Sequence, residues 1–151
     1  MLLFRFVTAL FIHQTIRSTR VPDIQKAKIL VVDNDAQLAD ELIGYLQKIG
    51  YEGVAAHGSR DALIKFKKNA FHLVITDLKM PEIDGLQLLE ILKTMDKQVS
   101  VVVISGYGTF DKALEALKKG AFDFIPKPFK LQQLKIIVSK ALSQHPALKL
   151  A

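Results

Sequence analysis

Polar side chains that could act together in chemistry follow several apolar runs of this chain. Asp33 and Asn34 come directly after one run and Asp77 follows another. Ser105 and Lys127 follow two later runs. A carboxylate that attacks phosphorus must approach a dianionic group, and a Mg²⁺ ion held by oxygen ligands can neutralise that charge. An ammonium and a hydroxyl can pair with the phosphoryl oxygens. These residue types indicate phosphoryl-transfer chemistry centred on Asp77.

Short strands that alternate with helices must position these residues. Segments with the apolar spacing of helices separate five apolar runs of β type, which are Ile29–Val32, Tyr51–Ala55, Leu73–Thr76, Val101–Ile104 and Phe122–Ile125. Such alternation predicts right-handed crossovers and a parallel sheet that is covered on both faces. We therefore expect an α/β fold, a doubly wound five-stranded parallel sheet with the flavodoxin-like order 2-1-3-4-5.

In sheets of this kind the site lies at the carboxyl ends of the strands, near the point where the strand order reverses. Asp33, Asp77, Ser105 and Lys127 each follow a predicted strand, so we expect them to converge there. Each of them alone could be a helix cap, a turn residue or a solvated loop residue. Their common location favours a functional site, with Asp33 as a metal ligand and Asp35 as a helix cap.

Three further residues mark predicted helix starts. Ser59 is a candidate N-cap for the second helix, and the third helix begins after Asp84. Gly85 is expected to permit a tight backbone at the start of that third helix.

Composition excludes several functions. The 151 residues suit one domain, and the absence of cysteine excludes disulfides, thiolate metal sites and cysteine nucleophiles, in keeping with a cytoplasmic location. Of the net charge of +6, residues 1–28 carry five basic side chains against one acidic side chain. The rest of the chain is nearly balanced, so we expect no direct nucleic-acid binding.

The predicted domain occupies residues 27–143, after an apolar and basic extension over residues 1–26. The longest uncharged stretch of that extension, Phe6–Ile16, is shorter than the roughly 20 residues that span a membrane. Three interpretations of the extension are considered, namely translation from an upstream start codon, a short interfacial helix, and a packing or dimerisation arm. Residues 144–151 are expected to form a short tail.

Four stretches together resemble the receiver domain of two-component response regulators, most closely receivers attached to AAA+ transcriptional activators. They begin at Ile29, Val74, Val103 and Gly120 and read ILVVDND, VITDLKMPEIDG, VISGYG and GAFDFIPKPF. The resemblance implies that Asp77 accepts a phosphoryl group from a histidine kinase or in a phosphorelay, and that the domain assists its own phosphorylation and dephosphorylation.

The resemblance also implies roles for individual residues. Mg²⁺ would be held by Asp33, Asn34, Asp77 and the backbone carbonyl of Lys79. Lys127 would pair with the phosphoryl group, before a cis bond to Pro128. Ser105 and the aromatic side chain of Phe124 would form the switch. The face made by the fourth helix, fifth strand and fifth helix would bind a downstream protein or a second copy of the chain.

One position departs from the family pattern. Most receivers have two adjacent acids after the first strand, whereas here the second is Asn34. Its carbonyl can still bind a metal, but weaker Mg²⁺ binding is expected because one negative charge is lost. We therefore consider a phosphorylation-independent binding module beside the leading interpretation, a stand-alone phospho-receiver. A DNA-binding regulator and a flavodoxin are less favoured, since neither a helix-turn-helix nor a phosphate-binding loop is evident.

Overall fold

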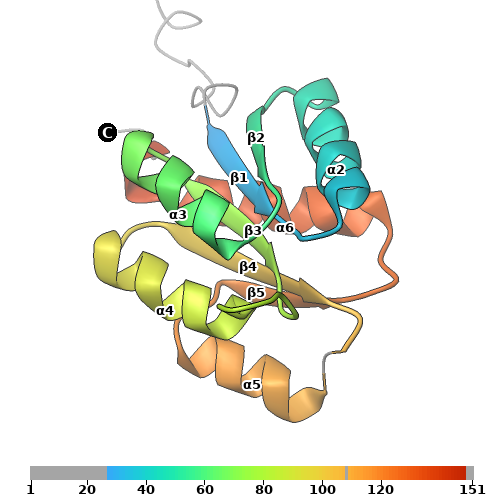
Figure 1. The fold of residues 1–151 in the computed structure, drawn as a ribbon. Helices are drawn as coiled ribbons and strands as arrows, with labels where there is room; N and C mark the ends of the chain where they lie inside the picture. Colours follow the sequence, from blue (N-terminus) through green and yellow to red (C-terminus); the bar gives the residue numbers. More distant parts are fainter. Residues whose placement is uncertain (1–26, 108, 149–151) are drawn as a thin grey trace, which may run out of the picture.

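A five-stranded sheet organises the computed structural model, which describes residues 27–107 and 109–148. All neighbouring strands are parallel, and the order β2-β1-β3-β4-β5 confirms the predicted fold class (Figure 1). The strands are β1 (Lys28–Val32), β2 (Glu52–Ala56), β3 (Leu73–Asp77), β4 (Ser100–Ser105) and β5 (Asp123–Pro126).

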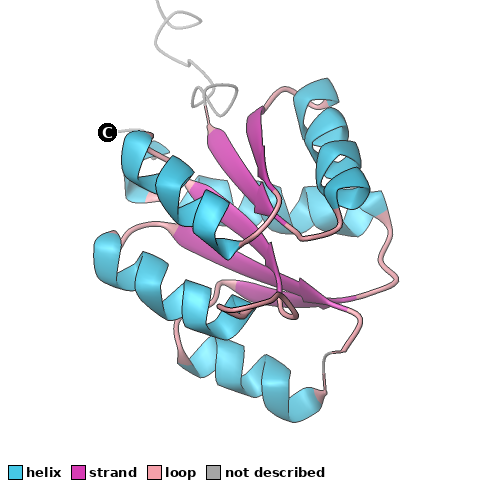
Figure 2. Ribbon diagram, in the orientation of Figure 1, coloured by secondary structure: helices cyan, strands magenta, loops and turns pink. Residues whose placement is uncertain are grey.

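Helices connect the strands and cover both faces of the sheet (Figure 2). Helices α3, α4 and α5 pack on one face and α2 and α6 on the other. A short 3-10 helix follows α6. The elements are α2 (Ala36–Lys48), α3 (Ser59–Lys68), α4 (Gly85–Met95), α5 (Phe110–Lys118), α6 (Leu131–Gln144) and η2 (Pro146–Leu148).

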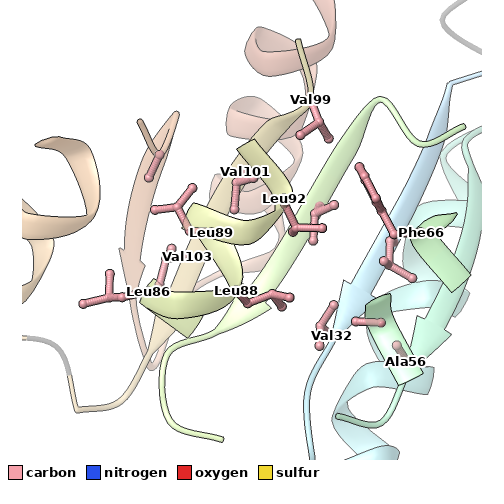
Figure 3. Packing of buried hydrophobic residues seen from close by; sticks show 14 of the residues in the cluster. Val32, Ala56, Phe66, Leu86, Leu88, Leu89, Leu92, Val99, Val101 and Val103 are labelled. Atoms are coloured by element: carbon pink, nitrogen blue, oxygen red, sulfur yellow. The ribbon is translucent and has the colours of Figure 1, made fainter. Parts of the chain in front are cut away.

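The sheet separates two apolar cores, and consecutive strand residues enter opposite cores. In β1, Leu30 and Val32 pack beneath α3 and α4, whereas Ile29 and Val31 pack against α2 and α6. This explains the continuous apolar runs, because a central parallel strand is buried on both faces. Figure 3 shows the first core, where side chains of α4 face Val101 and other residues of β4. Each fully buried side chain of this kind contributes about 1.5–3 kcal/mol.

Two of the predicted helix starts are confirmed. The Asp35 carboxylate accepts a hydrogen bond from the backbone N–H of Leu38 (3.2 Å) and caps α2. Asp84 caps α4 through a reciprocal arrangement with Gln87, in which each side chain accepts the other residue's backbone N–H. Both caps satisfy N–H groups that a helix start otherwise leaves without partners.

The predicted cap at Ser59 is wrong by one residue. Gly58 occupies the N-cap position of α3 without a side-chain hydrogen bond, and Ser59 is the buried first residue of the helix. The Asp61 carboxylate instead accepts the backbone N–H of His57 (3.3 Å). The carboxylate of Asp61, inside α3, thus binds the segment that precedes the helix, and the Ser59 hydroxyl does not act as the cap.

The segment after α6 packs against the fold over part of the predicted tail. His145 is buried, and Leu148 contacts the core beneath α2 and α6. The interpretations given for residues 1–26, and the last three residues of the tail, lie outside the described part of the chain. Within that described part, no helix combines the length and apolar character needed to cross a membrane.

Candidate functional site

Three charged side chains meet at the carboxyl ends of the strands, as predicted. Asp33 follows β1, Asp77 ends β3 and Lys127 follows β5. The Lys127 Nζ lies 3.4 Å from Asp33 Oδ2 and 3.6 Å from Asp77 Oδ1. Both carboxylates are largely buried, with 6% and 11% of their side chains exposed. The Lys127 ammonium is therefore shared by two largely buried carboxylates.

Local hydrogen bonds fix the two carboxylates and the lysine. Asp33 Oδ1 accepts the backbone N–H of Asp35 (2.9 Å), and Asp77 Oδ1 accepts that of Leu78 (2.9 Å). The backbone N–H of Lys127 donates to the carbonyl of Ser105 (2.9 Å), which ties the loop after β5 to β4. The bond between Lys127 and Pro128 is cis, as expected. The site is thus held by backbone contacts at the ends of the four neighbouring strands β1, β3, β4 and β5.

The start of α4 lies unusually close to Asp77 because Gly85 has no side chain. Its N–H donates to the carbonyl of Leu78 (2.7 Å). A Cβ at this position would overlap the Asp77 carbonyl oxygen and come within 2.8 Å of the Leu78 Cα. The expectation of a tight backbone at Gly85 is therefore confirmed. The backbone that Gly85 approaches so closely is that of Asp77, the central residue of the site.

The electrostatics of the site favour binding of a further cation. Burial raises the pKa of the Asp77 carboxyl above its ordinary value of 3.8, Lys127 opposes that rise, and the nearby Asp33 carboxylate adds to it. Ionised Asp77 is therefore only partly compensated by the lysine. A divalent cation placed between the carboxylates would stabilise both in their charged forms.

A cavity of about 620 Å³ opens over these residues. Its lining is Asp33, Asn34, Asp35, Asp77, Lys79, Met80, Pro81, Tyr107 and Lys127. In the described part of the chain, no three histidine or acidic side chains are grouped as metal ligands. An ion here would therefore be held by two carboxylates with amide or carbonyl oxygens, an all-oxygen set that suits Mg²⁺. Exposed Asn34 is placed to supply one such oxygen.

Neither of the two predicted switch residues lines the cavity. The hydroxyl of Ser105, at the end of β4, is buried and accepts the backbone N–H of Tyr107 (3.0 Å). Phe124 is half-buried on β5 and packs against the core beneath α4. The structure therefore places Ser105 on β4, beside the strand that Asp77 ends, and Phe124 one strand further away on β5. The serine hydroxyl is directed to its own loop.

Sequence reasoning missed Tyr107, Met80 and Pro81 in the outer wall of the cavity, and for Lys79 it considered only the backbone carbonyl and not the side chain. Tyr107 is 70% exposed, and the Lys79 Nζ lies over its ring, 4.2 Å from the centroid. Met80 and Pro81 complete that wall. Their position in the sequence could have indicated them, since Tyr107 lies two residues beyond Ser105 and Lys79 lies two residues beyond Asp77.

Comparisons with known proteins agree with this geometry. The family model for the response regulator receiver domain matches residues 29–139. The chain is 39% identical to the response regulator protein FleR of Pseudomonas aeruginosa over 121 residues, which are 80% of this chain and 26% of FleR. It is 35% identical to the transcriptional regulatory protein ZraR of Klebsiella oxytoca over 79% of this chain and 27% of ZraR. The chain thus spans about a quarter of the length of these relatives.

Solved structures show the same likeness. A response regulator receiver domain protein from Clostridium thermocellum superposes with a TM-score of 0.77 at 33% identity, covering 82% of this chain and 99% of that one. The beryllofluoride-activated NtrC4 receiver domain dimer superposes with a TM-score of 0.74 at 31% identity, covering 78% and 98%. The resemblance inferred from the four sequence stretches is confirmed, and the chain belongs to the family of response regulator receiver domains of two-component signal transduction.

Proposed function

We propose that this receiver accepts a phosphoryl group on Asp77 from a sensor histidine kinase or a phosphotransfer protein. Phosphorylation of an aspartate by a kinase is a general property of the family. The observation that carries the proposal for this chain is the meeting of Asp77, Asp33 and Lys127 beneath an open cavity. Two largely buried carboxylates that share one ammonium beneath an open cavity suit the binding of a cation and a phosphoryl group.

The geometry suggests how transfer proceeds. Asp77 Oδ1 is occupied by the N–H of Leu78 and faces Lys127, which leaves Oδ2 to attack phosphorus. A bond forms between Oδ2 and phosphorus as the bond from phosphorus to the donor's histidine nitrogen breaks, and that nitrogen keeps the electron pair. Lys127 moves its ammonium from the carboxylates to the phosphoryl oxygens and stabilises their charge.

Receiver domains generally bind Mg²⁺ at this site, and we propose the same here. The ligands would be Asp33, Asn34, Asp77 and the backbone carbonyl of Lys79, all of which belong to residues lining the cavity. When bound, Mg²⁺ supplies charge neutralisation between the carboxylates and the incoming phosphoryl group.

We further propose that Ser105 and Phe124 report phosphorylation to the face formed by α5, β5 and α6. Ser105 would leave the N–H of Tyr107 for the phosphoryl group, and Phe124 would follow it. Large apolar side chains are exposed on both helices of that face, namely Phe110, Leu114, Leu117, Leu131 and Ile136. Such exposure suits a contact with a downstream protein or a second copy of the chain.

Phosphorylation can be tested with a small-molecule donor. Incubation with acetyl phosphate and Mg²⁺ should add one phosphoryl mass to the intact protein. Asp77→Asn should abolish the addition, whereas Asp111→Asn, an exposed aspartate on α5, should leave it unchanged. An adduct that survives in Asp77→Asn, or no adduct with any donor including a cognate kinase, would overturn the proposal.

Asn34 supports a second candidate, a receiver-like module that binds its partner without phosphorylation. It predicts that Asp77→Asn leaves partner binding unchanged. Asn34→Asp separates the two candidates. A large gain in Mg²⁺ affinity and in phosphorylation would show that Asn34 tunes a working site, and no gain would favour the second candidate. The stand-alone arrangement and the cytoplasmic location remain predictions, which the size and fractionation of the native protein would test.

A further inference from the structure

Two histidines meet at the edge of the sheet opposite to Asp77. His72 precedes β3, at the beginning of the strand that Asp77 ends, and His145 follows α6. Their rings lie edge to face, with centroids 5.2 Å apart and an interplanar angle of 85°. Neither residue takes part in the proposed phosphoryl transfer.

Each ring accepts a hydrogen bond from a backbone N–H. The N–H of Lys28 donates to His72 Nδ1 (3.0 Å), and the N–H of Ala147 donates to His145 Nδ1 (3.1 Å). A ring nitrogen that accepts carries no proton, so both imidazoles are neutral with their hydrogen on Nε2. Protonation of either ring at Nδ1 would place its N–H against the backbone N–H that it now accepts, and would break that hydrogen bond.

The backbone of His72 also hydrogen-bonds to two neighbouring strands. Its N–H donates to the carbonyl of Lys28 (2.9 Å), and its carbonyl accepts the N–H of Ser100 (3.1 Å). The residue therefore connects the beginnings of β1, β3 and β4. His145 connects His72 to η2, because its ring contacts that of His72 and holds Ala147.

Burial opposes protonation of both rings. His145 is 5% exposed, and its Nε2 has no hydrogen-bond partner among the described residues. Burial lowers the pKa of both imidazoles below the ordinary value of 6.5, and for His145 the neighbouring His72 and Lys93 lower the pKa further. Asp96, after α4, acts in the opposite direction on both. The backbone of Lys28 also brings a cationic side chain to this edge.

A metal ion does not explain the pair. A ring whose Nδ1 accepts a backbone N–H carries its hydrogen on Nε2, so neither nitrogen is available as a ligand. Within residues 27–107 and 109–148 no third histidine or acid completes a ligand group. The two rings act as hydrogen-bond acceptors and not as ligands.

We propose that His72 and His145 form an acid-sensitive clasp that holds η2 against the beginnings of β1 and β3 and releases it when the rings are protonated. The clasp is complete above the ordinary histidine pKa of 6.5, where the rings are neutral whether folded or free. It is lost as the pH falls through the lowered pKa of the folded state. Release is local, because the hydrogen bonds that protonation breaks are those of the Lys28 and Ala147 amides, at the beginning of β1 and in η2.

Amide hydrogen exchange can test the clasp in the full chain. Protection factors, corrected for the intrinsic effect of pH, are measured at pH 7.5 and pH 5.0. Protection of the Ala147 amide should fall roughly tenfold, as expected for the loss of one hydrogen bond. The Lys28 amide should follow, while the Leu30 amide in the middle of β1 should keep its protection. Parallel loss at Leu30 would indicate global unfolding and would overturn a local clasp.

Matched variants separate titration from packing. Asparagine Oδ1 can replace a histidine Nδ1 as acceptor without titrating in this range, so the double variant His72→Asn, His145→Asn should lose the pH dependence at Ala147. His57→Asn alters an exposed histidine of the β2–α3 loop and should leave that dependence intact. Because the double variant could fold poorly, ring proton shifts of the wild type are followed in parallel by NMR. Titration of both rings at or above pH 6.5, or an unchanged Ala147 amide, would contradict the proposal.

Discussion

Buried ionisable groups differ in charge between the two edges of the sheet, namely the edge at the carboxyl ends of the strands and the edge at their beginnings. At the carboxyl ends of the strands, the Asp33 and Asp77 side chains lie around the Lys127 ammonium, and the pKa of Asp77 is raised because burial outweighs the lysine. At the opposite edge, His72 and His145 are neutral and accept backbone N–H groups. At the first edge the carboxylate charge is only partly compensated by the lysine, so a further cation can bind there. At the second edge the rings are neutral and serve as hydrogen-bond acceptors.

The comparison depends most on Lys127. Lys127→Met should slow phosphorylation by acetyl phosphate about a hundredfold, because the positive charge that stabilises the transferred oxygens is lost. The initial rate of adduct formation measures this effect. Lys130→Met changes an exposed lysine three residues away and should leave the rate unchanged. A normal rate in Lys127→Met would show that the charge at this edge is structural.

The second test concerns the backbone beneath Asp77. Gly85→Ala should lower the free energy of unfolding by about 2 kcal/mol, because the new Cβ forces α4 away from Asp77 and Leu78. Urea denaturation measures the change. Gly44→Ala is the matched control, since a Cβ there meets nothing within 4 Å, and it should stabilise α2 by up to about 1 kcal/mol. Equal effects of the two variants would refute a close approach at Gly85.

Removing the charge of Asp77 should stabilise the fold. The pKa of Asp77 is raised in the folded state. Below pH 3.8 the carboxyl is neutral in both the folded and unfolded states, and its burial costs no stability. As the pH rises through the folded pKa, the buried carboxyl ionises and stability is lost. Asp77→Asn should therefore raise the free energy of unfolding by about 1 kcal/mol at pH 7 and by nothing in acid. Denaturation curves at both pH values check this, with Asp111→Asn as control. A destabilised variant at pH 7 would show that Lys127 overcompensates for burial.

The smallest effect is expected at the opposite edge. The Lys28 Nζ lies 3.7 Å from Glu52 Oε1, and the glutamate side chain is 61% exposed. Glu52→Gln should change the free energy of unfolding by less than about 0.5 kcal/mol, and still less in high salt. A loss above about 1 kcal/mol would mean that charge pairing also stabilises this edge, and the contrast between the edges would then weaken.

Much of the fold and of the site could be predicted from local patterns. The apolar runs located each strand to within one or two residues. For the central strands β1, β3 and β4 the reason is that a strand buried on both faces is apolar nearly throughout. Asp33, Asp77 and Lys127 could be placed together because parallel strands bring their carboxyl ends to one edge. The cap at Ser59 was misplaced by one residue, because α3 begins at Ser59 itself, after Gly58 and without any side-chain cap. The roles of Ser105 and Phe124 stay predictions, since they concern a second conformation.

The sequence by itself determined the order of the elements, the covering of both sheet faces and the convergence of Asp33, Asp77 and Lys127, since these follow from periodicity and strand direction. Only the tertiary structure decided how charges are shared. Three contacts join residues far apart in the chain: Lys127 between two carboxylates, the Lys79 ammonium over the Tyr107 ring, and the paired rings of His72 and His145. Burial and hydrogen bonding, which set the pKa of each group, exist only once these segments pack together.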